Sequence, residues 1–174
     1  MRAFFWLSSA LLSLVPASSV YAQDVEPAAP PPEWVIQGQV PEGMALIYLY
    51  NNSGSTLFGG SYSFKVDKGT VAKLPRKTWT AIVLAPGTYR IAVQDLIKAP
   101  LETGAGERLH WMYGFSPEKS WAFPLAGTPY VLQAIPDSVA AELRGEFTWV
   151  PPLVPLPEPP PRDSVVSLSD AGTH

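Results

Sequence analysis

Proline is concentrated at two points of this 174-residue chain, and the two clusters limit where a folded domain can lie. Eleven of the twenty prolines fall within residues 27–32 and 151–161. Consecutive prolines cannot donate the backbone hydrogen bonds of helices and sheets, and they favour extended polyproline II. We therefore expect a proline-rich spacer over 23–33, one domain over 34–150, and a disordered, proline-rich tail over 151–174. This tail is expected to leave the domain surface, as a spacer rather than as a docking motif for a proline-reading partner.

Residues 1–22 have the pattern of a signal peptide. Arg2 gives the positive start, an apolar run follows over 4–15, and the chain then reads Val-Tyr-Ala up to Ala22, with small residues where a signal peptidase cuts. The apolar run is about a dozen residues, whereas a membrane span needs roughly 20. We expect cleavage after Ala22 rather than an uncleaved anchor. The mature protein is then expected in the periplasm or outside the cell, without a membrane span.

Charge and cysteine content exclude several classes of function. The formal charge of −3 becomes −4 when Arg2 leaves, and the remaining basic residues are scattered singly except for Arg76 and Lys77. We expect no basic patch and hence no nucleic-acid partner. The chain has no cysteine, which removes disulfides, thiolate metal sites, thiol nucleophiles and a lipid-modified N-terminal cysteine.

Between the proline clusters the pattern is that of β-strands. Residues 44–50 form a continuous apolar run, typical of a strand covered on both faces. Apolar and polar side chains alternate over 62–67, the period of a half-buried strand. A turn at 67–69 then leads to a strand over 71–74. Further strands are expected over 108–115, 121–125, 129–135 and 146–150.

The strongest local signal is Ala85-Pro86-Gly87-Thr88, between apolar runs at 79–84 and 89–93. Proline followed by glycine is typical of a type II turn, so we expect these two runs to pair as an antiparallel hairpin. One helix is expected over 138–144, with Asp137 as its N-cap and Gly145 as its stop. The fold class that follows is mostly β, an antiparallel two-sheet β-sandwich with at most one short helix.

Three stretches carry a resemblance to a known family. They are ALIYLY at 45–50, the segment from FKVDKGTV at 64–71 through IVLAPGTY at 82–89, and FPLAGTPYVL at 123–132. Their order resembles the bacterial secreted family called domain of unknown function 2846. The resemblance implies a prealbumin-like sandwich, of the transthyretin or carboxypeptidase-regulatory kind, and brings no catalytic residues. The chain departs from the family in lacking the lipoprotein cysteine and in having Asn51 where an arginine often follows the first strand.

Residues that carry chemistry are few. The two histidines, His110 and His174, are too few for a zinc site without cysteine, and His110 is expected to be a surface or hydrogen-bonded structural residue. Acid–base chemistry would need a pair of carboxylates, for which the candidates lie in the region 102–137: Glu102, Glu107, Glu118 and Asp137. There is no Gly-x-Ser-x-Gly motif. We expect neither an enzyme nor a cofactor.

Aromatic residues form the candidate ligand or partner surface. Indole and phenol rings on a sheet can stack on sugars or on a partner, and we select five residues for this role: Trp34, His110, Trp111, Tyr113 and Trp121. Core packing is the alternative, and for Trp79, Trp111 and Trp149 it is the favoured one. The segment 98–119 is expected to be an extended binding loop.

Three functional hypotheses remain open at this point. The first is a non-enzymatic envelope or secreted module that binds a partner protein or glycan. The second is a carbohydrate- or peptidoglycan-binding module that uses exposed tryptophans. The third is a periplasmic hydrolase that uses the loop carboxylates. The sequence does not specify the identity of the partner or the oligomeric state.

Overall fold

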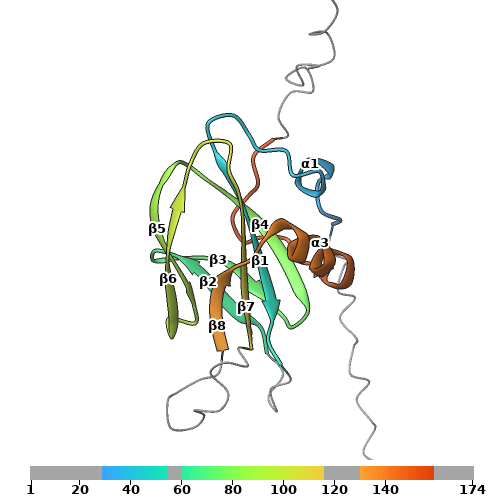
Figure 1. The fold of residues 1–174 in the computed structure, drawn as a ribbon, viewed down its shortest axis with the longest axis vertical. Coiled ribbons are helices and arrows are strands. Elements are labelled where there is room, and N and C mark those ends of the chain that lie inside the picture. Colours follow the sequence, from blue (N-terminus) through green and yellow to red (C-terminus); the bar gives the residue numbers. More distant parts are fainter. Residues whose placement is uncertain (1–28, 55–59, 116–129, 159–174) are drawn as a thin grey trace, which may run out of the picture.

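The computed structural model describes residues 29–54, 60–115 and 130–158, and within these ranges the chain forms two packed β-sheets (Figure 1). The five-stranded sheet has the order β8 (Tyr130–Ala134), β7 (Arg108–Phe115), β1 (Ala45–Asn52), β4 (Thr78–Leu84) and β9 (Thr148–Trp149). The four-stranded sheet has the order β3 (Gly69–Leu74), β2 (Tyr62–Val66), β5 (Gly87–Val93) and β6 (Ile97–Thr103). The expected two-sheet β-sandwich is confirmed.

The two sheets differ in strand direction. Every pair in the four-stranded sheet is antiparallel, as expected. In the five-stranded sheet β1 runs antiparallel to β4 but parallel to β7, and β4 runs parallel to β9. The sequence pattern did not indicate these parallel pairs, because alternation of apolar residues is the same for both directions.

Strand β1 is covered on both faces, as its apolar run predicted. Its side chains alternate between two cores, and those of Ile47 and Leu49 belong to the core between the sheets. Those of Leu46, Tyr48 and Tyr50 belong to a second core on the opposite face of the five-stranded sheet. The chain therefore has three layers, with helices covering that second face.

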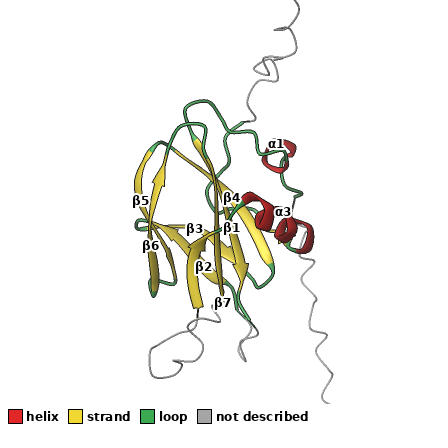
Figure 2. Cartoon of the chain, viewed as in Figure 1, coloured by secondary structure: helices red, strands yellow, loops and turns green. Residues whose placement is uncertain are grey.

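Two helices of the described part of the chain form this third layer, where at most one short helix was expected. Helix α1 (Glu33–Ile36) begins directly after Pro32, inside the segment assigned to the spacer, and buries Trp34 and Val35. Helix α3 (Asp137–Glu146) matches the expected helix but starts after Pro136. It also continues through Gly145, which was expected to stop it. In Figure 2 both helices lie beside β1 and β4, away from β5 and β6.

The turn at Pro86 does not join a hairpin. Strand β4 pairs with β1 and β9, whereas β5 pairs with β2 and β6, so this turn carries the chain from one sheet to the other. Gly87 is not among the glycines with positive φ, and it already belongs to β5. The type II hairpin was thus a wrong prediction, since apolar runs beside a Pro-Gly pair are equally compatible with a corner between sheets.

The segment 98–119, expected to be a binding loop, contains most of β6 and all of β7 in its described part. The proline at position 100 hid β6 in the sequence, because proline is depleted in strands. Pro100 is tolerated because β6 is the outermost strand of its sheet, where a missing N–H breaks no ladder.

The beginning of the proline-rich tail lies on the domain. The backbone N–H of Leu153 donates to the carbonyl of Val71 in β3, at 2.8 Å. Val154 packs against the core between the sheets, and Leu156 packs against the core under the helices. The prediction that the tail leaves the surface after residue 150 is therefore wrong for the described residues 151–158, and the remainder lies outside the described part.

Candidate functional site

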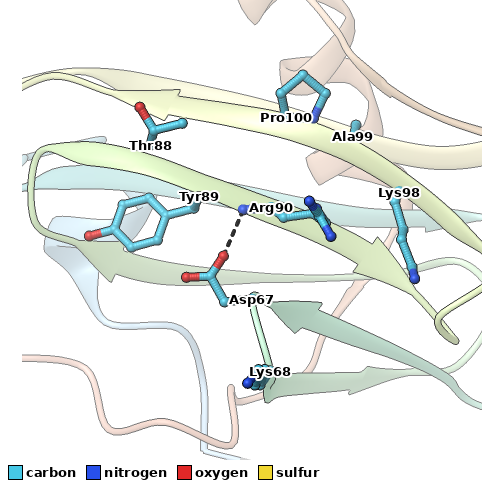
Figure 3. Close-up of a pocket in the computed structure, with 8 residues that line it drawn as sticks. All are labelled: Asp67, Lys68, Thr88, Tyr89, Arg90, Lys98, Ala99 and Pro100. Atoms are coloured by element: carbon cyan, nitrogen blue, oxygen red, sulfur yellow. Dashed lines mark hydrogen bonds between the residues drawn. The ribbon is translucent and has the colours of Figure 1, made fainter.

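A hollow that is open to solvent lies on the outer face of the four-stranded sheet (Figure 3). It has a volume of about 700 Å³ and runs over β5, β6 and the turn between β2 and β3. Three basic side chains line it: Lys68, Arg90 and Lys98. The remaining lining residues are Asp67, Thr88, Tyr89, Ala99 and Pro100.

Strand periodicity brings these basic residues together. Ile91 and Val93 point into the core between the sheets, so Arg90 on β5 points outward. Leu101 points into the same core, so Lys98 and Pro100 on β6 point outward beside it, and Arg90 pairs with Pro100 in register. None of the three cations forms an ion pair with a described residue. Residues that are scattered singly in the sequence thus form a basic patch, which corrects the expectation that none exists.

Asp67 fixes the turn that closes one side of the hollow. Its backbone N–H donates to the carbonyl of Arg90 at 2.7 Å, and its Oδ1 accepts the N–H of Arg90 at 2.9 Å. Asp67 has a φ of 51°, a left-handed conformation that aspartate tolerates better than most residues. The turn is therefore bonded to β5, and the carboxylate is held beside the backbone of Arg90 (Figure 3).

A second, smaller hollow of about 150 Å³ lies beside a buried histidine. The Nε2 atom of His110 is 3.1 Å from Oδ1 of Asp137, and its Nδ1 is 3.2 Å from the hydroxyl of Tyr50. The ring also stacks on Tyr48, with centroids 4.6 Å apart. A carboxylate can only accept a hydrogen bond, so Nε2 carries the proton and Nδ1 of the neutral ring accepts from Tyr50.

Burial governs the ionisation of this cluster. It lowers the pKa of His110 to about 4, although the Asp137 carboxylate acts in the opposite direction. Burial likewise raises the pKa of the hydroxyls of Tyr48 and Tyr50. At neutral pH His110 is thus an uncharged ring, and both of its nitrogens are hydrogen-bonded under helix α3. This matches the expectation of a hydrogen-bonded structural histidine.

Of the five residues selected as a ligand surface, the four in the described part of the chain are buried or partly buried. Trp34 is only 5% exposed, because α1 turns it into the core beside Tyr48 and away from solvent. Tyr113 is also buried and faces Tyr62 and Tyr130 between the sheets. Trp111 is partly buried in the same core and lines the smaller hollow together with His110. Trp121 lies outside the described residues.

The candidate carboxylates are not paired for catalysis in the described part of the chain. Glu102 and Asp137 both line the smaller hollow, but Asp137 is engaged with His110 and lies 3.6 Å from the guanidinium of Arg108. Glu107 accepts the backbone N–H of Gly104, at 2.7 Å. Glu118 lies outside the described residues. Within the described ranges no group of three or more histidine, aspartate or glutamate side chains is placed to hold a metal ion.

Comparisons with known proteins add little to this geometry. No family model and no curated protein matches the chain. Among solved structures, the N-terminal domain of AlgF from P. aeruginosa is similar with a TM-score of 0.36 and 17% sequence identity, over 56% of this chain and 100% of that chain. A likeness this weak carries no argument about function. Helices long and apolar enough to cross a bilayer are not found in the described ranges.

Proposed function

We propose that this protein is an exported, non-catalytic binding module that meets an envelope partner through the outer face of its four-stranded sheet. One observation carries the proposal. The outer face of the five-stranded sheet is sealed by α1 and α3, whereas the opposite sheet leaves an open hollow lined by three unpaired cations. Binding sites are concave and hold a few polar groups placed for orientation.

Export is the part of the proposal that rests on the sequence. The signal-peptide pattern of residues 1–22 supports it. Fractionation of producing cells tests it. We expect the chain outside the cytoplasm and starting at Gln23; a cytoplasmic chain that retains Met1 would contradict export.

The hydrolase hypothesis is less well supported by the same geometry. Its best carboxylate, Asp137, already holds His110, and the imidazole ring is buried rather than presented to a substrate. A buried base with a pKa near 4, whose ring nitrogens are already engaged by Asp137 and Tyr50, is poorly matched to hydrolysis at neutral pH. The carbohydrate hypothesis remains open, but the surface that could bind a carbohydrate is the hollow on the four-stranded sheet and not a set of exposed tryptophans.

Crosslinking from the two opposite faces tests the binding surface. Because the chain has no cysteine, one introduced cysteine is a unique attachment point. Thr88→Cys places a photo-crosslinker in the hollow, and Glu142→Cys places the same group on the exposed side of α3. We expect adducts with an envelope component from position 88 only. Adducts from position 142 alone, or from neither position, would overturn the proposal.

A further inference from the structure

The hollow presents two kinds of polar group side by side. Lys68, Arg90 and Lys98 supply positive charge, and Asp67 supplies an acceptor. Oδ1 of Asp67 is used by the N–H of Arg90, whereas Oδ2 has no hydrogen-bond partner in the described chain. A ligand that satisfies this lining has to carry anionic groups and hydrogen-bond donors within a few ångströms of each other.

The nearby cations are not equivalent to those of the hollow. Lys65 lies on the same sheet but is paired with Asp95, and this hydrogen bond lowers the pKa of the Asp95 carboxyl. Lys73 is exposed on β3 outside the hollow, and Arg76 is exposed in the turn after β3. Unpaired positive charge next to a free acceptor is therefore concentrated at Lys68, Arg90 and Lys98.

The remaining lining bears on the class of anionic ligand. A polymer that offers only anionic groups would leave Oδ2 of Asp67 without a donor, whereas one that also carries hydroxyl groups can donate to it. A peptide partner would normally anchor an apolar or aromatic side chain in an enclosed pocket. The hollow is open instead and offers the exposed ring of Pro100 and the hydroxyl of Thr88, a surface that a saturated, hydroxylated sugar ring can cover.

We propose that the hollow binds an acidic polysaccharide, with sugar carboxylates against Arg90 and Lys98 and a sugar hydroxyl donating to Asp67. The inference rests on the proposed function and names the ligand class for the same surface. Charge-assisted hydrogen bonds from arginine and lysine are the contacts that carboxylates use most strongly. Recognition depends on these contacts and on the acceptor, not on tryptophan stacking.

Titration of the purified protein with polygalacturonate tests the ligand class, with neutral dextran of similar length as the control polymer. We expect polygalacturonate to bind and dextran to bind at least tenfold more weakly. Arg90→Gln and Lys98→Gln are each expected to weaken binding about tenfold, the effect of losing one charge-assisted hydrogen bond. Arg76→Gln and Lys73→Gln remove the same charge outside the hollow and are expected to change affinity less than about twofold.

The variant Asp67→Asn tests whether Asp67 accepts a hydrogen bond from the ligand or only lies beside the cations. Asparagine tolerates positive φ and retains an oxygen for the N–H of Arg90, so the turn is preserved. If Asp67 accepts from a sugar hydroxyl, the variant weakens binding by roughly threefold although it removes a negative charge, because the amide NH2 that replaces Oδ2 is a donor and cannot accept that hydrogen bond. Stronger binding by the variant would overturn the acceptor role.

Two further polymers decide between ligand classes. Polyglutamate or a DNA oligonucleotide that binds as tightly as polygalacturonate would overturn the assignment to a polysaccharide. If none of these polymers binds while Thr88→Cys still crosslinks to an envelope component, the ligand class is wrong and the proposed function stands. If neither binding nor crosslinking occurs, both are overturned.

Discussion

His110 and Asp137 join the sheet to the helix above it, with Nε2 of the imidazole 3.1 Å from Oδ1 of the carboxylate. The side chain of His110 is 3% exposed, whereas that of Asp137 is 64% exposed. Asp137 is the first residue of α3, where a negative charge is favoured by the helix dipole. Its side chain caps no backbone N–H, contrary to expectation, because it reaches His110 instead.

The buried neutral His110 predicts that acid destabilises the fold. Its pKa is about 4 in the folded chain and about 6.5 when unfolded, so between these values the unfolded chain binds more protons. The contribution of His110 to stability is therefore complete above pH 6.5 and is lost as the pH falls towards 4. We expect the free energy of unfolding, measured in urea, to fall by roughly 1 kcal/mol from pH 7.5 to 5.5 and by about 3 kcal/mol at pH 4.

The variant His110→Gln provides the control for this prediction. Glutamine can keep a hydrogen bond to Asp137 but does not titrate, so the decrease between pH 7.5 and 5.5 is expected to disappear. The carboxylates of the fold titrate in both proteins and cancel in the comparison. Identical pH profiles for the two proteins would show that His110 is not held neutral.

The sequence predicted the parts of the fold that depend on one strand at a time. The apolar run at 44–50 correctly indicated a strand buried on both faces, and the helix after Asp137 was placed within two residues of its ends. What it missed depends on neighbours from distant segments. The strand that pairs with β4, the edge position that makes Pro100 acceptable, and the third layer over β1 are all set by tertiary packing.

The candidate site was missed for a related reason. Arg90 and Lys98 are eight positions apart in the sequence, with nothing between them to mark a site. They become neighbours because β5 and β6 pair and both side chains take the outward phase of the pleat. If the sequence had indicated a strand at β6, the alternation of its side chains would have placed Lys98 on the same outer face as Arg90. The aromatic residues were misleading because rings that pack a small core and rings that bind sugars have the same sequence signature.

The side chain of Asn51 forms hydrogen bonds between the two sheets. It is fully buried in β1, and its Nδ2 donates to the carbonyls of Leu74 and Pro75, at 2.8 and 2.9 Å. These bonds tie the end of β1 to the end of β3 in the opposite sheet. An arginine at this position would bury a positive charge, which is costly unless the charge is paired.

Substitutions at two threonines of β4 are expected to change the free energy of unfolding in opposite directions. The hydroxyl of Thr80 is buried without a hydrogen-bond partner in the described chain, whereas that of Thr78 donates to the carbonyl of Pro75 at 2.6 Å. Thr80→Val removes an unsatisfied polar group at nearly constant volume, so we expect it to raise the free energy of unfolding by about 1 kcal/mol. Thr78→Val should lower it by a similar amount in the same urea titration. Equal losses for both variants would show that Thr80 is hydrogen-bonded.

Two glycines test the assignment of the turn at Pro86. Gly87 has no positive φ, and a Cβ there would meet Tyr89 at an ordinary 3.4 Å, so Gly87→Ala is expected to change stability by less than about 0.5 kcal/mol. Gly106 has open space around it but a φ of 78°, so Gly106→Ala is expected to cost about 1 kcal/mol through backbone strain. Thermal unfolding of the two variants checks this. A type II turn at Gly87 would instead give Gly87→Ala a loss similar to that of Gly106→Ala.

The first residues of the proline-rich tail are predicted to belong to the folded unit. Leu153 extends the hydrogen bonding of β3, and Val154 and Leu156 each fill part of a different core. Ending the chain at Pro152 exposes the apolar surface that these side chains cover, which we expect to lower the free energy of unfolding by about 2 kcal/mol. A chain that ends at Glu158 keeps all three residues and serves as the matched reference. Equal stability of the two truncated chains, measured in urea, would mean that residues 153–156 rest on the domain without stabilising it.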